Sequence, residues 1–184
     1  MLEKVAKVLK HRGVDCKIVH AADASIKTGV KTDMGHGDRW PEIHKRILAA
    51  DILVIGTPIW MGQRCSVCQR VMERIDAMLH ETNDKGQLPL YNKVAGACVV
   101  GNEDGAQQVS ASILYNLMQV GATIPPNAEA YWVGLAGGSD DFIDVALRDP
   151  YVKELVSYLG NNLVHMAEIL RANPIPAEGN VSAS

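Results

Sequence analysis

Residues 51–62 read DILVIGTPIWMG, an apolar run followed by a loop that contains glycine and proline. The branched residues 52–55 are too few for a helix, and such a run is typical of a strand buried on both faces of a parallel sheet. Gly56 and Pro58 predict that the strand ends there in a sharp turn, because proline cannot donate to a neighbouring strand. In open α/β sheets, ligands bind beyond the carboxyl ends of the strands. The loop that carries Trp60 is therefore the first candidate for a binding site.

The composition indicates an ordinary globular protein. Of the 184 residues, 47% are hydrophobic and 21% are charged, and the formal net charge is −3. This charge and the lack of a basic stripe argue against a nucleic-acid partner. No apolar run is long enough to span a membrane, and the charged N-terminus does not resemble a signal peptide. Four cysteines lie in expected strands or beside a helix, which predicts a reducing cytoplasm rather than a disulfide framework: Cys16, Cys65, Cys68 and Cys98.

Helical and extended patterns alternate along the chain. Apolar residues at helical spacing, with glycines after helix ends and prolines in first turns, predict helices at residues 1–12, 41–50, 66–80, 105–120 and 149–171. Short apolar runs rich in branched residues predict strands at residues 16–20, 52–55, 94–100 and 129–133. This alternation predicts βαβ units, a parallel sheet and a three-layer α/β fold.

The chain is expected to form one domain over residues 1–172. The following residues 173–184 contain two prolines and mostly small or polar residues, so a disordered tail is predicted there. A long loop is expected at residues 21–38, where hydrophobic periodicity is absent and Gly, Asp, Ser and Thr are frequent. Loops of this length in compact domains are usually functional or mobile.

Three loops carry a resemblance to a known family. Residues 51–62, 101–106 (GNEDGA) and 131–138 (YWVGLAGG), with residues 73–76 (ERID) in the helix after the first loop, together resemble the flavodoxin-like NADPH-dependent FMN reductase and NAD(P)H-dependent oxidoreductase family. The resemblance extends to about residue 171. It implies a flavodoxin-like fold, FMN as the bound cofactor and NAD(P)H as the electron donor. It also implies a small acceptor, such as a quinone or free flavin, and a homodimer or higher homo-oligomer.

The same resemblance implies that two loops hold the flavin. The isoalloxazine ring is flat and apolar with a polar edge, so it needs an apolar wall and backbone groups at its rim. The first loop would supply the wall and the amides near Gly62 the rim, while Gly105 would allow close backbone approach. The expected cofactor-binding residues are Thr57, Pro58, Ile59, Trp60, Met61 and Gly62 in the first loop, and Asn102, Glu103, Asp104 and Gly105 in the second. Glu103 and Asp104 equally suit caps of the next helix, and no catalytic side chain is assigned.

The N-terminus departs from the family pattern. The family begins with a strand and a Ser/Thr-rich loop that holds the FMN phosphate at a helix N-terminus. Here Met1 already lies in the first expected helix, and the missing strand is a central one in flavodoxin-like sheets. Two explanations stay open: the protein starts upstream of this Met1, or it is a shortened relative with weakened flavin binding. The preserved loops favour the first.

Two other motifs have competing interpretations. Cys65 and Cys68 have the spacing of a redox-active CxxC pair at a helix N-terminus, but Cys68 also fits the apolar stripe of that helix. Asp33, His36 and Asp38 are possible metal ligands, yet loops rich in Asp and Gly usually hold no metal, and EF-hand spacing is not met. Core packing and a metal-free loop are therefore the expectations.

The leading functional hypothesis is an FMN-dependent NAD(P)H oxidoreductase. A flavodoxin-like electron carrier is the first alternative, although such carriers are usually far more acidic than −3. A flavin-free, shortened relative that acts as an interaction subunit is the second.

Overall fold

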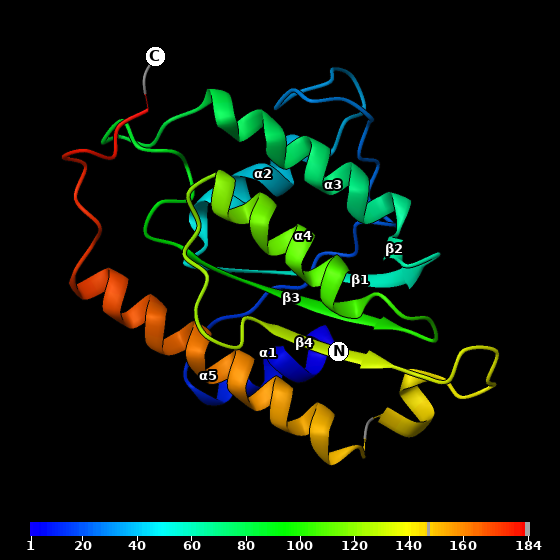
Figure 1. The fold of residues 1–184 in the computed structure, drawn as a ribbon. Coiled ribbons are helices and arrows are strands. Elements are labelled where there is room, and N and C mark those ends of the chain that lie inside the picture. Colours follow the sequence, from blue (N-terminus) through cyan, green and yellow to red (C-terminus); the bar gives the residue numbers. More distant parts are fainter. Residues whose placement is uncertain (147, 183–184) are drawn as a thin grey trace.

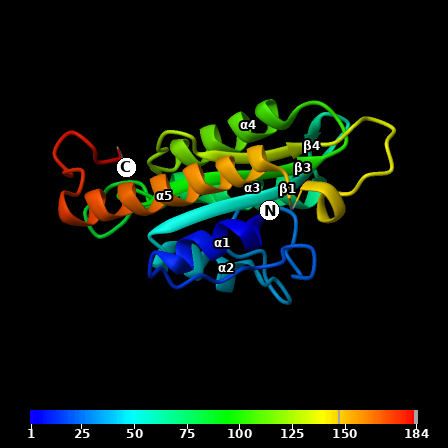
Figure 2. The ribbon, with the colours of Figure 1, turned by 90° about the horizontal axis from the view of Figure 1, so that it is seen from below.

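The computed structural model describes residues 1–146 and 148–182, and it has three layers (Figures 1 and 2). A four-stranded sheet lies in the middle, with α3 and α4 on one face and α1 and α5 on the other. The helices are α1 (Leu2–His11), α2 (Trp40–Ala49), α3 (Ser66–Asp76), α4 (Ala106–Gln119) and α5 (Pro150–Ala172), with a 3₁₀ turn η1 (Ala77–His80) and a π-helical turn η2 (Phe142–Ala146). The strands are β1 (Ile52–Trp60), β2 (Gln63–Arg64), β3 (Val94–Gly101) and β4 (Glu129–Val133). The predicted three-layer, flavodoxin-like α/β fold is confirmed.

The strand order is β2-β1-β3-β4, and β1, β3 and β4 run parallel. β3 lies between β1 and β4 and is buried over its first six residues. Its alternate residues divide between the two layers: Ala95 and Ala97 join the core under α3 and α4, whereas Val94 and Cys98 join the core under α1 and α5. This division follows from the two-residue period of a strand. Helix α2 packs in the same core as α3 and α4.

β1 continues four residues beyond the glycine at which the sequence predicts its end. Pro58 lies opposite Val100 in the parallel ladder, and the strand then turns back as a hairpin with β2. The carbonyl of Asp51 accepts from the amide of Val94, so residues 53, 55 and 57 direct their backbone groups toward β3 and Pro58 faces away from it. The missing amide hydrogen of Pro58 therefore removes no ladder hydrogen bond, and the prediction of a turn at this residue is wrong.

The predicted strand at residues 16–20 is also wrong, because this segment is irregular in the structure. Within the described residues, no segment pairs with the outer edge of β1 before Ile59. A short extended segment is stable as a strand only when a neighbour satisfies its backbone groups. Ile18 and Val19 accordingly remain 40% and 37% exposed. The outer edge of β1 is therefore unpaired before Ile59 among the described residues.

The described part of the tail, up to residue 182, makes hydrogen bonds with the connection at residues 81–93. The amide of Gln87, which is fully buried, donates to the carbonyls of Ile175 and Pro176. Asn92 accepts from the Ile175 amide at 2.6 Å, and Tyr91 donates to Asn180. The tail is held by side chains of the 81–93 connection, which the composition of the tail alone does not reveal.

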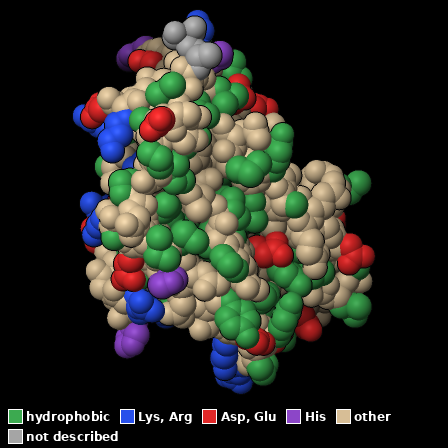
Figure 3. Space-filling model, turned by 60° about the vertical axis from the view of Figure 1, so that its left-hand side comes forward, with side chains coloured by type: hydrophobic (Ala, Val, Ile, Leu, Met, Phe, Trp, Pro, Cys, Tyr) green, Lys and Arg blue, Asp and Glu red, His purple; other side chains and the backbone are tan. Residues whose placement is uncertain are grey.

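Acidic and basic side chains lie interspersed on the face of the molecule toward this tail (Figure 3).

Candidate functional site

The loops after β1, β3 and β4 meet at the carboxyl edge of the sheet. The amide of Gly62, in the hairpin after β1, donates to Glu103 Oε2 across 3.3 Å. Asn102, directly after β3, donates from Nδ2 to the carbonyl of Asp140 at 3.1 Å. The three loops are therefore cross-linked through the polar side chains of the middle one. This edge is where ligands bind in parallel α/β sheets.

The residues predicted as a flavin wall alternate along β1. Thr57 and Ile59 are buried, with 4% and 2% exposure, whereas Pro58 and Trp60 are exposed on the opposite face. Trp60 is 63% exposed, and Met61 at the hairpin tip is 88% exposed. Because a strand has a two-residue period, a continuous stretch cannot present every side chain to one ligand. Pro58, Trp60 and Met61 are available as a wall, while Thr57 and Ile59 belong to the core.

The hairpin closes through a two-residue turn in which a methionine has a positive φ angle. Trp60 pairs with Gln63, so only Met61 and Gly62 form the connection, and their φ angles are +52° and +71°. Two positive φ angles are characteristic of the type I′ turn, which matches the twist of the two strands. Glycine adopts this conformation freely, but methionine does so at a cost. The exposed tip of the site is therefore locally strained.

Gly105 allows a close approach, as the sequence predicts, but its close neighbour is the backbone of Gly62 and not a position open to a ligand. Its φ is +118°, and a Cβ atom at this position would lie 2.8 Å from the carbonyl oxygen of Gly62. Only glycine fits such a contact. Gly105 is also the N-cap of α4, with no side-chain hydrogen bond at the cap. The alternative that Glu103 or Asp104 caps this helix is therefore wrong, since Glu103 binds the hairpin and Asp104 is exposed.

The N-terminal end of α1 lies beside the exposed face of β1. A Cβ atom on Gly56 would come within 2.6 Å of the Leu2 side chain, so the first turn of α1 packs directly on β1 at Gly56. Gly56 lies two residues before Pro58 and on the same face of the strand. Helix N-termini carry free amides and partial positive charge, which suit a phosphate. An apolar wall and a helix N-terminus thus occupy neighbouring positions on one side of the sheet.

The structure adds two apolar side chains that the sequence analysis did not select. Leu135, in the loop after β4, is 78% exposed, and Ile143, in η2, is 72% exposed. The η2 turn is fixed to β4 by an edge-to-face contact between Phe142 and Trp132, whose ring centroids are 5.9 Å apart. The glycines of the 134–139 loop were the only sequence signal for this part of the site. Their neighbours are exposed enough to contact a ligand or another chain.

Two thiols lie behind the hairpin, around the buried hydroxyl of Thr57. Thr57 Oγ1 donates to the Pro58 carbonyl and lies 3.4 Å from Cys65 Sγ, and it accepts from the Cys65 amide at 3.2 Å. Cys65 is the N-cap of α3, where its sulfur accepts from the amide of Cys68. Burial raises the pKa of the Cys68 thiol to about 11, against a smaller opposing effect of the hydrogen bond with Thr57.

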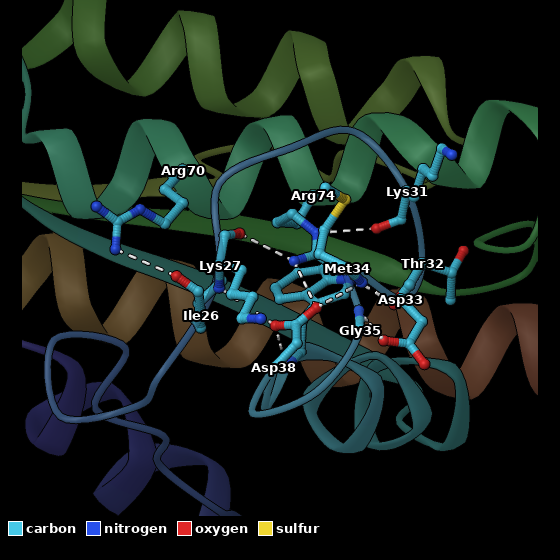
Figure 4. A network of polar contacts seen from close by, with 11 residues as sticks. Ile26, Lys27, Lys31, Thr32, Asp33, Met34, Gly35, Asp38, Arg70 and Arg74 are labelled. Atoms are coloured by element: carbon cyan, nitrogen blue, oxygen red, sulfur yellow. Dashed lines mark hydrogen bonds and ion pairs between the residues drawn. The ribbon is translucent and has the colours of Figure 1, made fainter.

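The loop at residues 21–38 is clamped by Arg74 of α3 (Figure 4). The Arg74 guanidinium is fully buried, donates to the carbonyls of Lys27, Lys31 and Thr32, and pairs with Asp38 at 2.8 Å. It also lies 5.6 Å from the centre of the Trp40 ring. The long loop is therefore anchored to α3 chiefly through Arg74, and Arg70 of the same helix adds a hydrogen bond to the Ile26 carbonyl at 3.2 Å.

The same contacts bear on the possible metal ligands of this loop. Asp38 is engaged by Arg74 and by backbone amides, and Asp33 accepts from the Gly35 amide at 2.7 Å. No group of three His, Cys, Asp or Glu side chains with metal-binding geometry occurs among the residues that the structure describes. The carboxylates organise the loop.

Within the described residues, no helix has the length and apolar character needed to cross a bilayer.

Comparisons with known proteins agree with this architecture. The chain is 33% identical over 184 residues to 8-demethyl-8-aminoriboflavin-5'-phosphate synthase of Streptomyces davaonensis, covering 95% of this chain and 72% of that protein. The crystal structure of RosB with the bound intermediate 8-demethyl-8-formylriboflavin-5'-phosphate superposes with a TM-score of 0.86 at 33% identity, over 95% of this chain and 73% of RosB.

Other relatives are partial or distant. The chain is 37% identical over 179 residues to a protein described as divalent metal cation transporter MntH of Mycobacterium bovis; the match covers 94% of this chain but spans only 26% of that protein. An archaeal flavodoxin superposes with a TM-score of 0.53 at 11% identity, over 89% of this chain and 87% of the flavodoxin, and this likeness shows the fold alone.

The model of the family described as NADPH-dependent FMN reductase matches residues 1–135, which include β1, β3 and both loops of the candidate site. The chain thus belongs to the NADPH-dependent FMN reductase family, a family of flavin oxidoreductases whose cofactors are FMN and NAD(P)H.

Proposed function

We propose that this protein binds FMN at the carboxyl edge of the sheet and transfers electrons from NAD(P)H to a small acceptor, such as a quinone or free flavin. The observation that carries the proposal is the position of the exposed face of β1, with Pro58 and Trp60, beside the N-terminal end of α1. A flat, apolar ring with a phosphate tail requires these two features side by side.

The residues present fit the ring end of the cofactor. Pro58 and Trp60 would form the wall, Met61 its tip, and the amide of Gly62 a donor at the rim. Asn102 and Glu103 would lie at the rim of the ring beside Gly62, because Glu103 is hydrogen-bonded to the hairpin. When bound, the flavin supplies the electron-transfer chemistry. The protein positions the ring and shields it from water, and no side chain need react.

The test is a flavin-binding and turnover measurement with a matched pair of variants. The purified protein should acquire a flavin absorption spectrum with FMN and should consume NADPH in the presence of a quinone. Trp60→Ala should weaken FMN binding about tenfold, since stacking on an aromatic ring contributes about 1.5 kcal/mol. Tyr115→Ala removes an exposed aromatic from α4 and should leave binding unchanged. Bound flavin without NADPH consumption would indicate an electron carrier, and a chain that binds no FMN would contradict both.

A second candidate function follows from the likeness to RosB. The TM-score to RosB is 0.86, whereas a flavone reductase and an NADH:FMN oxidoreductase superpose with 0.68 and 0.58. A flavin phosphate would then be a substrate that is modified on its ring and released. Mass spectrometry of the flavin after incubation separates the two functions. An unchanged FMN mass with continuing NADPH oxidation supports the reductase, whereas a new flavin mass supports ring modification.

We further propose that a second copy of the chain covers the carboxyl edge. Trp60, Met61, Leu135 and Ile143 are large apolar side chains with more than half of their surface exposed, and they follow β1 and β4 at this one edge. Apolar groups gathered in this way mark ligand-binding or subunit surfaces. Sedimentation of the wild-type protein and of Ile143→Asp should give a dimer and a monomer, respectively. Equal sedimentation of both proteins would exclude this surface.

A further inference from the structure

The cysteines of residues 65–68 form a cluster that flavin binding does not require. Cys65 Sγ lies 3.4 Å from the hydroxyl of Thr57. The same sulfur accepts from the backbone amide of Cys68 at 3.5 Å. Cys65 Sγ therefore lies directly over the backbone of Cys68 in the first turn of α3. Both cysteines are free thiols in the structure.

The two thiols differ in accessibility. Cys65 is half-buried, whereas Cys68 is 4% exposed within the core between α3 and the sheet. Cys65 also occupies the N-cap of α3, at the end of the helix that faces the hairpin. Burial raises the pKa of Cys68, so its sulfur stays protonated until a reaction brings it into use. Cys65 is therefore the accessible thiol that can attack an external disulfide, and Cys68 is the buried thiol that can resolve the mixed disulfide.

We propose that Cys65 and Cys68 form a reversible disulfide by exchange with a low-molecular-weight disulfide, with Cys65 attacking and Cys68 resolving. In the first step the Cys65 thiolate bonds to one sulfur of the external disulfide, and the other sulfur leaves as a thiolate. In the second step Cys68 gives its proton to the released thiolate and attacks Cys65 Sγ, which expels the second external thiol. Overall, two cysteine thiols are oxidised to one disulfide, and one external disulfide is reduced to two thiols.

Oxidation would change the hairpin of the candidate site. In the reduced protein, the Thr57 hydroxyl connects the end of β1 to the first turn of α3 by bonding to both the sulfur and the amide of Cys65. A Cys65–Cys68 bond would draw both sulfurs toward each other, since a disulfide requires a separation of about 2 Å. The contact of Thr57 with Cys65 Sγ would then be lost. The pair would make the geometry next to Pro58 and Trp60 dependent on the thiol–disulfide balance.

The test uses the reduced protein, oxidised glutathione and peptide mapping by mass spectrometry. The wild-type protein should yield a peptide with an internal Cys65–Cys68 bond that is two hydrogens lighter than the reduced peptide, and dithiothreitol should reverse it. Cys68→Ala should instead accumulate glutathione on Cys65, because the resolving sulfur is gone. Cys65→Ser should form neither product, and serine preserves the N-cap, so this variant should fold.

Cys16→Ser is the matched control, since it removes a half-buried thiol remote from the pair and should leave the internal disulfide unchanged. Glutathione that stays on Cys65 in the wild-type protein would show that Cys68 does not resolve it. An unreacted Cys65 under conditions that modify Cys16 would show that the first step does not occur. Either result would overturn the proposal, and neither depends on whether the chain binds flavin.

Discussion

The carboxylate of Glu103 accepts a hydrogen bond from the backbone amide of Gly62 across 3.3 Å, although 41 residues separate them in the sequence. This contact joins the β1–β2 hairpin to the loop after β3. It also engages the amide that we assign to the rim of the flavin. Glu103 therefore competes with the ring for a donor, and it provides a direct test of the proposed site.

Glu103→Ala should bind FMN about two to ten times more tightly than the wild-type protein, because a typical hydrogen bond contributes about 0.5–1.5 kcal/mol net and the Gly62 amide becomes free. Fluorescence titration of FMN measures the change. Asp104→Ala removes the same charge from the adjacent exposed position and should alter the affinity little. If Glu103→Ala weakens binding, the carboxylate supports the ring and does not compete with it.

Met61→Asn should stabilise the protein. Met61 has a φ of +52°, a region that costs most L-residues about 1–2 kcal/mol and that asparagine enters more easily. The free energy of unfolding in urea should rise by about 0.5–1 kcal/mol. Met61→Leu keeps the same backbone cost and should change stability by less than about 0.5 kcal/mol. Equal values for the two variants would mean that the turn is not strained.

Gly105→Ala should destabilise the protein by about 3 kcal/mol, since it combines a positive φ with a Cβ atom 2.8 Å from the Gly62 oxygen. Gly137 offers a control that separates the two effects. Its φ is +74°, but a Cβ atom there would have no neighbour within 4 Å. Gly137→Ala should therefore cost about 1 kcal/mol, for the backbone conformation alone. Similar losses in urea unfolding would argue against close packing of the two loops.

The Asp38–Arg74 pair should make stability depend on acid pH. Burial alone would raise the pKa of Asp38, but hydrogen bonds from backbone amides, above all that of Met34, and from Arg74 outweigh it and lower the pKa to about 2. A lowered pKa means that the ionised form stabilises the fold above about pH 4. About 2 kcal/mol should be lost as the pH falls from 4 to 2.

Asp38→Asn tests this dependence. At pH 7 it should cost about 3–5 kcal/mol, because it leaves the buried Arg74 charge without its partner. Its disadvantage relative to the wild-type protein should then shrink by about 2 kcal/mol on going to pH 2. Asp23→Asn, at an exposed position, should follow the wild-type pH profile. A constant difference between Asp38→Asn and the wild-type protein at all pH values would exclude ionisation of Asp38 as the cause.

The sequence predicts the helices and the two central strands well because their signals are local. Val94 to Val100 carries small and branched residues that suit burial, and Asp149 precedes Pro150 as a cap whose side chain accepts from the Tyr151 amide. The segment at residues 16–20 has equally good strand composition but lacks a partner. Pairing is a property of two segments, so composition alone does not decide it. The same limit applies to the contacts of the tail, which involve Gln87 and Asn92 of a distant segment.

The sequence predicts which strand ends carry the two segments of the candidate site, but not how their side chains are oriented. Both segments lie at the carboxyl ends of parallel strands, although residues 57–60 belong to β1 itself. It does not reveal that β1 continues to Trp60, and this continuation decides which side chains face outward. Thr57 and Ile59 are consequently core residues despite lying in the most specific motif. The contact between Gly62 and Gly105 also could not be predicted from the sequence, because it joins two loops that only the folded structure brings together.

The Arg74 clamp has a consequence for how this protein can change over evolution. A surface loop normally tolerates insertions and deletions. Here one guanidinium satisfies three loop carbonyls at fixed separations, and its own charge is neutralised by an aspartate at the far end of the same loop. A loop of another length would leave the buried Arg74 guanidinium without some of its hydrogen-bond and charge partners. The segment should therefore vary in side chains but not in length for as long as arginine is retained at position 74.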